Sequence, residues 1–245
     1  MTVGTKWKDA PIQTVTLTLY RFDTWRARAW ALGMMGLGRI LLPRVPDIGF
    51  WKLCGAGKGE GFTPTANMAT VAILATWPDH ATAQFGTQHS ASFQRYARKA
   101  DESWTVYLSA TRSSGAWAGQ APFEVSTQTS DGPLAALTRA TIKPGIAAQF
   151  WRRVPDISRM IGSDPNVAFK IGIGEVPLLH QVTFSIWPDA QAMAAFARQD
   201  GPHARAIRAV RAGKWFREEL YARFAILGDH GTWGGSSPLD RLEAA

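Results

Sequence analysis

The chain has 245 residues, of which 46% are hydrophobic and 19% charged, a balance that excludes a disordered chain and allows a large core. The formal net charge of +8 favours anionic partners, but zinc-finger, RNP-type and polybasic signatures are absent, so we expect no nucleic-acid partner. The single cysteine, Cys54, excludes an internal disulfide, and residues 1–13 lack the apolar core of a signal peptide, so we expect a cytoplasmic protein.

The first part of the chain alternates segments typical of strands and helices. Residues 14–22 alternate threonine with valine and leucine, as in a half-buried strand, and a helix over residues 24–42 follows. Three more strands are expected, at residues 49–57, 68–77 and 103–111. Asp79 caps a second helix, which continues to Tyr96. The expected order is therefore β-α-β-β-α-β.

The second part of the chain repeats this order. Pro144 starts a helix that reaches Met160, and Asp189 caps a second helix, which Gly201 and Pro202 interrupt and restart. Four strands are expected, at residues 137–143, 166–174, 178–187 and 220–227.

Sequence matches at a nearly constant offset relate the two parts. Arg-Val-Pro-Asp-Ile occurs at residues 44–48 and 153–157, and Trp-Pro-Asp occurs at residues 77–79 and 187–189. Weaker matches join residues 51–57 to 169–174 and residues 113–119 to 228–235. Four matches in one order indicate a duplicated unit of roughly 110 residues.

The sequence thus predicts an α+β fold built from two tandem ferredoxin-like (βαββαβ) modules. The modules span residues 14–117 and 134–235, with a linker at residues 118–133 and a tail at residues 236–245. We expect their sheets to join as a pseudo-dimer of the dimeric α/β barrel type.

The five histidines are the candidates for chemistry, because hydrolase, nucleotide-binding and zinc-protease motifs are absent. They are too dispersed for a structural zinc site, whereas a haem needs only one imidazole in an apolar cleft. His203 follows the restart of the helix and shares a face with Ala206, Ile207 and Val210. Arginines flank that face and could pair with propionates: Arg205, Arg208 and Arg211.

Other interpretations of these histidines stay open. His203 could instead start a helix with its ring bonded to a backbone carbonyl and the arginines in water. His89 occupies the corresponding helix of the first part. His180 alternates with Val182 and Phe184 on one strand face, which predicts a buried ring. His89 and His180 are therefore alternative haem ligands.

Three stretches of the chain resemble one family. The stretches TLTLYRFDTWRARAWALGMMG, WPD and GPHARAIRAVRAGKWFREELYARFAILGDHGTWGG are similar to the spheroidene monooxygenase family, the carotenoid 2-ketolases of purple photosynthetic bacteria. More distantly, both parts are similar to dimeric α/β barrel proteins, which include antibiotic-biosynthesis monooxygenases, haem-degrading enzymes and chlorite dismutases.

The resemblance implies an O₂-dependent enzyme that takes electrons from ferredoxin. It would hydroxylate C-2 of spheroidene, an acyclic methoxylated carotenoid, twice, and the resulting diol would lose water to give spheroidenone. It also implies haem between the sheet and the second helix of the second module, with His203 on the iron. The expected surrounding residues are Val182, Phe184, Arg205, Ile207, Arg208 and Arg211.

A carotenoid substrate implies contact with a membrane. The apolar stretch at residues 30–43 contains Arg39 and three glycines and is too short to span a bilayer. Together with the positive net charge, it suits peripheral contact with an anionic intracytoplasmic membrane, and an amphipathic core helix explains it equally well. Two other functions remain open: a cofactor-free monooxygenase of the same fold, and a non-catalytic carotenoid or haem carrier.

Overall fold

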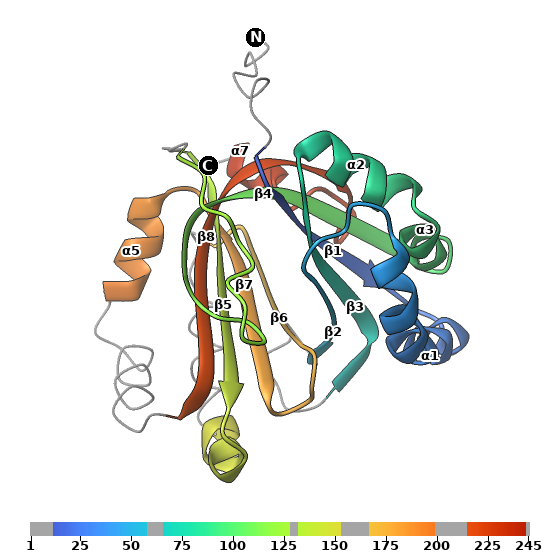
Figure 1. The fold of residues 1–245 in the computed structure, drawn as a ribbon, viewed down its shortest axis with the longest axis horizontal. Coiled ribbons are helices and arrows are strands. Elements are labelled where there is room, and N and C mark those ends of the chain that lie inside the picture. Colours follow the sequence, from blue (N-terminus) through green and yellow to red (C-terminus); the bar gives the residue numbers. More distant parts are fainter. Residues whose placement is uncertain (1–11, 58–65, 128–131, 153–166, 199–214, 244–245) are drawn as a thin grey trace.

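In the computed structural model, the described residues are 12–57, 66–127, 132–152, 167–198 and 215–243. Within these ranges, eight strands form one closed barrel with helices packed on its outside (Figure 1). Around the barrel the strands are β1 (Thr14–Arg21), β3 (Ala66–Trp77), β2 (Trp51–Gly57), β6 (Phe169–Gly174), β7 (His180–Trp187), β5 (Leu134–Ile142), β8 (Phe216–Gly231) and β4 (Glu102–Gly115). The helices are α1 (Trp25–Leu41), η1 (Leu42–Arg44), α2 (His80–His89), α3 (Ala91–Ala97), η2 (Pro144–Ile146), α5 (Ala190–Arg198) and α7 (Asp240–Glu243).

Both halves of the chain have the same connectivity. In the first half, β1 lies between β3 and β4, and β2 pairs with β3. In the second half, β5 lies between β7 and β8, and β6 pairs with β7. This is the strand order of the ferredoxin-like βαββαβ fold. The α+β class and the barrel expected from the sequence are therefore confirmed.

Two antiparallel junctions close the barrel. The long strands β4 and β8 pair from Trp104–Gly231 to Gly115–Leu220, whereas β2 and β6 pair only at their tips, through Gly55–Gly174 and Ala56–Ile173. The β2–β6 junction is therefore the point where little backbone pairing holds the halves together.

The barrel interior is a packed apolar core. Alternation in β1 sends Val15, Leu17 and Leu19 inward, and all three are fully buried. Each of the remaining strands also adds inward side chains to the same cluster. The segment after β8, which was expected to be a tail, packs Leu239 and Leu242 against this core.

A matched turn follows the last strand of each half. Gly115 and Gly231 have φ values of 99° and 88°, a region that favours glycine. A Cβ atom at either position would collide with a backbone carbonyl oxygen, that of Glu219 or Ser103, respectively. The chain therefore needs glycine at both places.

A carboxylate from the opposite half holds each of these turns. Glu218, near the start of β8, accepts hydrogen bonds from the turn after β4, and Glu102, at the start of β4, accepts them from the turn after β8. The donors, at 2.7 to 3.0 Å, are the backbone N–H groups of Ala118 and Gly119 for Glu218, and of Gly234 and Gly235 for Glu102. The two halves are thus fastened to each other in the same way twice.

Among the described residues, no helix has the length and apolar character that crossing a bilayer requires.

Candidate functional site

Large side chains fill the space between sheet and helices in the first half. Tyr20, Leu53 and Ile73 project outward from β1, β2 and β3 and are at most 2% exposed. Tyr20 stacks on Tyr96 of α3 with ring centroids 5.2 Å apart. Tyr96 donates a hydrogen bond to the carbonyl oxygen of Met34 in α1. At these three positions the space between the sheet and the helices is therefore filled by buried side chains.

Strand register identifies the corresponding positions in the second half. Thr14 pairs with Trp77 in the first half, and Leu134 pairs with Trp187 in the second, so the two Trp-Pro-Asp segments fix the alignment. Counting along the paired strands matches Tyr20 with Ala140, Ile73 with Thr183 and Leu53 with Gly172.

The second half therefore has small residues where the first half has large ones. We call Ala140, Gly172 and Thr183 the cradle. In the described part of the chain, apolar packing on this outer face is confined to two small clusters at the ends of β5. One cluster contains Ile142, Phe150 and Trp215, and the other contains Leu134, Trp187, Met193 and Phe196.

Five of the predicted site residues lie outside the described residues: His203, Arg205, Ile207, Arg208 and Arg211. Their roles stay predictions. The repeat of Arg-Val-Pro-Asp-Ile at residues 153–157 lies outside the described residues as well.

Val182 and Phe184 lie on the barrel side of β7, fully buried in the interior core. Their neighbours Thr183, which belongs to the cradle, and Ser185 face outward. Contact between a cofactor and Val182 or Phe184 stays a prediction, and in this packing such contact would have to come from within the barrel.

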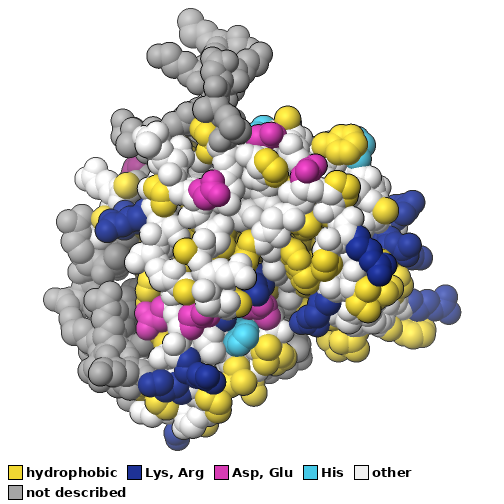
Figure 2. Space-filling view, viewed as in Figure 1, with side chains coloured by type: hydrophobic (Ala, Val, Ile, Leu, Met, Phe, Trp, Pro, Cys, Tyr) yellow, Lys and Arg dark blue, Asp and Glu magenta, His cyan; other side chains and the backbone are white. Residues whose placement is uncertain are grey.

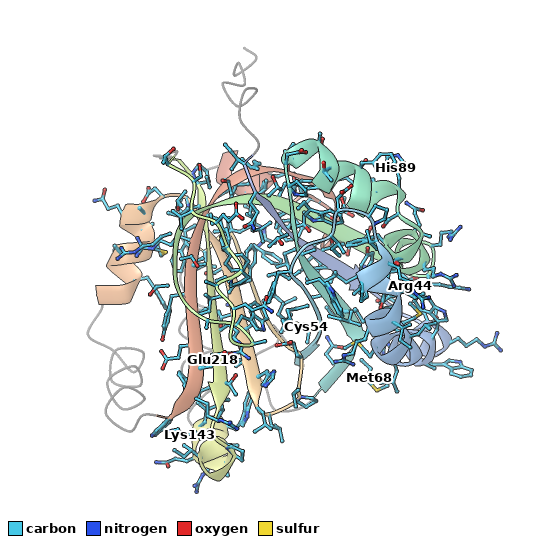
Figure 3. The ribbon with its side chains drawn as sticks, viewed as in Figure 1. Arg44, Cys54, Met68, His89, Lys143 and Glu218 are labelled. Carbon is cyan, nitrogen blue, oxygen red and sulfur yellow. The ribbon has the colours of Figure 1, made fainter. Side chains whose placement is uncertain are left out.

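The two alternative ligands lie in different surroundings. His89 is exposed at the end of α2, on the outside of the molecule (Figure 3), where it stacks on the exposed ring of Phe85 at 4.9 Å. His180 was expected to be buried, but its side chain is 24% exposed, because it begins β7 at the rim of the barrel.

A groove lies beside the tips of β2 and β6, with a volume of about 180 Å³. Its apolar walls come from α1, from β3, from the β6–β7 hairpin and from Trp151. They include Leu32, Met35, Met68, Val176, Leu178 and Trp151. Met68 lies at the tip of β3 (Figure 3). The groove also reaches Gly174 and Gln181, the latter paired with Ala140 of the cradle.

A partly buried carboxylate organises the polar side of this groove. Glu175 Oε2 accepts a hydrogen bond from Trp117 Nε1 at 2.7 Å, and Oε1 lies 3.2 Å from Lys52 Nζ. Burial raises the pKa of Glu175, but the Trp117 hydrogen bond and the Lys52 charge outweigh it, so the pKa lies below its usual value. His180 Nδ1 lies 3.3 Å from Glu175 Oε2. Because the carboxylate can only accept, Nδ1 must be the donor.

A second ion pair, of which only the arginine is buried, lies nearby. Arg139, which is 2% exposed, pairs with Glu218, and its guanidinium lies over the ring of Trp117 at 5.6 Å. Trp117 therefore contacts both polar groups, which links the groove to the turn after β4. No sequence pattern predicted a role for Glu175, which lies between the strands expected at residues 166–174 and 178–187.

Across the described ranges, no three His, Cys, Asp or Glu side chains come together as a metal site.

No family model matches the sequence. The chain is 51% identical to spheroidene monooxygenase of Cereibacter sphaeroides over 230 residues, which cover 93% of this chain and 71% of that protein. The chain belongs to the spheroidene monooxygenase family. Its members from Rhodobacter capsulatus and Rubrivivax gelatinosus are 48% and 34% identical to it, over 91% and 85% of this chain and 94% and 80% of theirs. The resemblance seen in the sequence is confirmed, and membership of the spheroidene monooxygenase family makes the chain a monooxygenase.

Solved structures agree on the fold. An aldoxime dehydratase (OxdRE) in complex with butyraldoxime superposes with a TM-score of 0.63 at 10% identity, covering 96% of this chain and 87% of that one. A second aldoxime dehydratase gives a TM-score of 0.56 at 11% identity, covering 88% and 82%. At such low identity, these two structures bear on the architecture of the spheroidene monooxygenase family and not on its chemistry.

Proposed function

We propose that the protein is a haem-dependent carotenoid ketolase. It hydroxylates C-2 of spheroidene and related acyclic methoxy-carotenoids twice, using O₂ and reduced ferredoxin, and the geminal diol loses water to give spheroidenone. The observation that carries this proposal is 51% identity over 93% of the chain to a protein named spheroidene monooxygenase. Each hydroxylation consumes one O₂, two electrons and two protons and releases one water, so one site can perform both.

The cradle supports the proposal of a haem on the outer face of the second half. A flat macrocycle needs a surface without protruding side chains, and Ala140, Gly172 and Thr183 provide one where the first half has Tyr20, Leu53 and Ile73. A bound haem would supply an oxidant strong enough to break the C–H bond at C-2. His203 would bind the iron, and Arg205, Arg208 and Arg211 would hold the propionates, as the sequence predicts.

The described residues contribute position and dryness to such a site. The clusters around Phe150 and around Trp187 border the cradle at the two ends of β5 and exclude water there. The packed barrel core forms a rigid wall behind it. A rigid, dry wall is what aims one carbon of a long substrate at a reactive centre.

We also propose that α1 rests on an anionic membrane from the cytoplasmic side. Trp25, Leu32, Leu37 and Ile40 are 73%, 58%, 43% and 57% exposed. The helix carries arginines and no acidic residue. Figure 2 shows hydrophobic and Lys or Arg side chains together over this part of the face. Such a surface suits apolar insertion combined with attraction to acidic headgroups, and the net charge of +8 also suits an acidic ferredoxin. Sedimentation with anionic liposomes should therefore weaken as salt rises.

We further infer that the two halves arose by tandem duplication. Their shared connectivity, their matched Trp-Pro-Asp segments and the two carboxylate-held turns support this inference.

The absorption spectrum and the iron content of the isolated protein test the cofactor directly. We expect a Soret band, stoichiometric iron, and ketone formation from spheroidene with O₂ and reduced ferredoxin. A colourless, iron-free and fully active protein would favour the cofactor-free alternative. Pigment binding without any ketone would favour a carrier.

Substitution of histidine tests the proposed iron ligand. His203→Ala should lose haem and activity while the circular dichroism of the barrel is unchanged, and His89→Ala, at an exposed position, should keep both. If His203→Ala keeps haem, the ligand is another residue, with His180 the next candidate.

A further inference from the structure

The groove beside β2 and β6 is apolar on most sides and polar on one. Leu32 and Met35 of α1, Met68 of β3 and Trp151 contribute apolar surface, whereas Glu175, His180 and Gln181, all from the β6–β7 hairpin, bring hydrogen-bonding groups together. An apolar cleft with a few convergent polar groups is typical of a small-molecule site.

His180 is the group in this groove that is best prepared to bind a ligand. Glu175 is fixed by Trp117 and Lys52, and it accepts the Nδ1 proton of His180. Among the described residues, the hydrogen bonding of this ring involves Nδ1 alone. Within the described ranges Nε2 has no partner, so it can bind one: the neutral ring accepts from a hydroxyl, and the imidazolium donates to an ether oxygen.

The volume of the groove limits what enters it. Pockets that enclose a drug-sized molecule measure roughly 300–1,000 Å³. At about 180 Å³, this groove takes only the end of a long chain. Leu32 and Met68 both line the groove and are 58% and 50% exposed, so the rest of the chain can leave along the apolar face of α1.

We propose that this groove binds the oxygen-bearing end of an acyclic polyene and that His180, as the imidazolium whose Nδ1 donates to Glu175, donates a hydrogen bond from Nε2 to the ether oxygen. The identity of the ligand rests on the proposed function. His180 is then a specificity-determining residue, which separates methoxylated carotenoids from hydrocarbon carotenes. Because the groove reaches Gln181, which pairs with Ala140, the bound end lies at the edge of the cradle.

Binding measurements in detergent micelles test the role of His180. Tryptophan quenching gives the Kd of spheroidene and of an acyclic carotene without oxygen, each with the full-length protein. One additional hydrogen bond predicts that spheroidene binds about tenfold more tightly. His180→Ala should remove this preference and leave the Kd of the carotene unchanged, and His180→Gln should restore part of it. An undiminished preference in His180→Ala would overturn the assignment.

A glycine substitution tests the groove itself. Gly55 lines the groove, and a Cβ atom there meets nothing within 4 Å, so Gly55→Leu adds a side chain to the groove from an unobstructed Cβ position. It should weaken the binding of both polyenes by about tenfold or more. Gly145→Leu is the matched control, because Gly145 has the same open surroundings and lies outside the groove. Wild-type affinity in Gly55→Leu, with an unchanged melting temperature, would rule the groove out.

These measurements need no turnover, so their results can contradict the groove assignment without contradicting the proposed function. If His180→Ala loses the preference and the wild type forms no ketone, the groove assignment stands and the ketolase proposal falls. If the wild type forms ketone and His180→Ala keeps the preference, only the groove assignment falls.

Discussion

The two halves of the molecule use one connectivity for two purposes. In the first half, Tyr20, Leu53 and Ile73 fill the space between the sheet and its helices. In the second half, the register places Ala140, Gly172 and Thr183 there. The difference lies in side-chain volume and not in backbone, which indicates that a repeated unit can become a site by losing bulk while its twin keeps the structure stable.

Giving the second half the side chains of the first should have the largest effect. The triple variant Ala140→Tyr, Gly172→Leu and Thr183→Ile fills the cradle, so we expect haem loss and a fall in ketone formation of roughly 100-fold or more. The barrel should survive because these side chains point away from its core. The iron-to-protein ratio and the rate of ketone formation measure both effects.

Thr183→Val, which keeps the side-chain volume, is the matched control and should retain haem. A triple variant with full haem content would show that the cofactor is bound elsewhere.

The two turn-holding carboxylates should differ in strength. Glu218→Ala leaves Arg139 buried without its partner, which should cost about 3–5 kcal/mol in the free energy of unfolding. Glu102→Ala should cost less, about 1–3 kcal/mol, because its partner Arg21 is 38% exposed and mainly hydrogen bonds are lost. Urea unfolding of both variants measures the difference, and equal losses would contradict the asymmetry.

The same carboxylates predict acid sensitivity. Burial raises the pKa of Glu218. The hydrogen bonds from Gly119 and Ala118 and the charge of Arg139 lower it by more, so the folded pKa lies below its ordinary value. A group whose folded pKa is depressed stabilises the protein fully above its unfolded pKa and loses this effect as pH falls through the folded value. Melting temperature should therefore fall below about pH 4.5 more steeply in the wild type than in Glu218→Gln.

Removing the helix caps should change the free energy of unfolding least, and by nearly the same amount in the two halves. Asp79 accepts a hydrogen bond from Thr82 N at 2.8 Å, and Asp189 accepts one from Ala192 N at 2.7 Å. Each change to alanine should cost about 1 kcal/mol. Calorimetry on the two variants measures this loss, and a difference above about 1 kcal/mol between them would mean that the halves differ in more than side-chain volume.

Local patterns predicted the local structure. Alternation in residues 14–22 and the caps Asp79 and Asp189 identified a strand and two helix starts, because these signals depend on neighbours in the chain. The helix expected to continue to Tyr96 is instead two helices, α2 and α3, because Ser90 between them is extended with ψ of 142°.

Contacts between residues that are distant in sequence could not be predicted from these patterns. The strand expected at residues 220–227 extends over Phe216–Gly231, because pairing with β4 and β5 lengthens it beyond its own alternation. The partners of Glu175 are Trp117 and Lys52, which lie far away in the sequence and share no motif with it. The cradle was equally hidden, since only strand register shows which small residues replace which large ones.

The turns held by Glu102 and Glu218 also bear on how the chain folds during synthesis. A nascent chain that ends at Trp117 contains β1 to β4, but β2 and β4 have not yet met β6 and β8. Such unpaired strand edges invite pairing with other chains. The carboxylate that secures the first turn is supplied by β8, so this turn can be secured only after the second half of the chain has been synthesised.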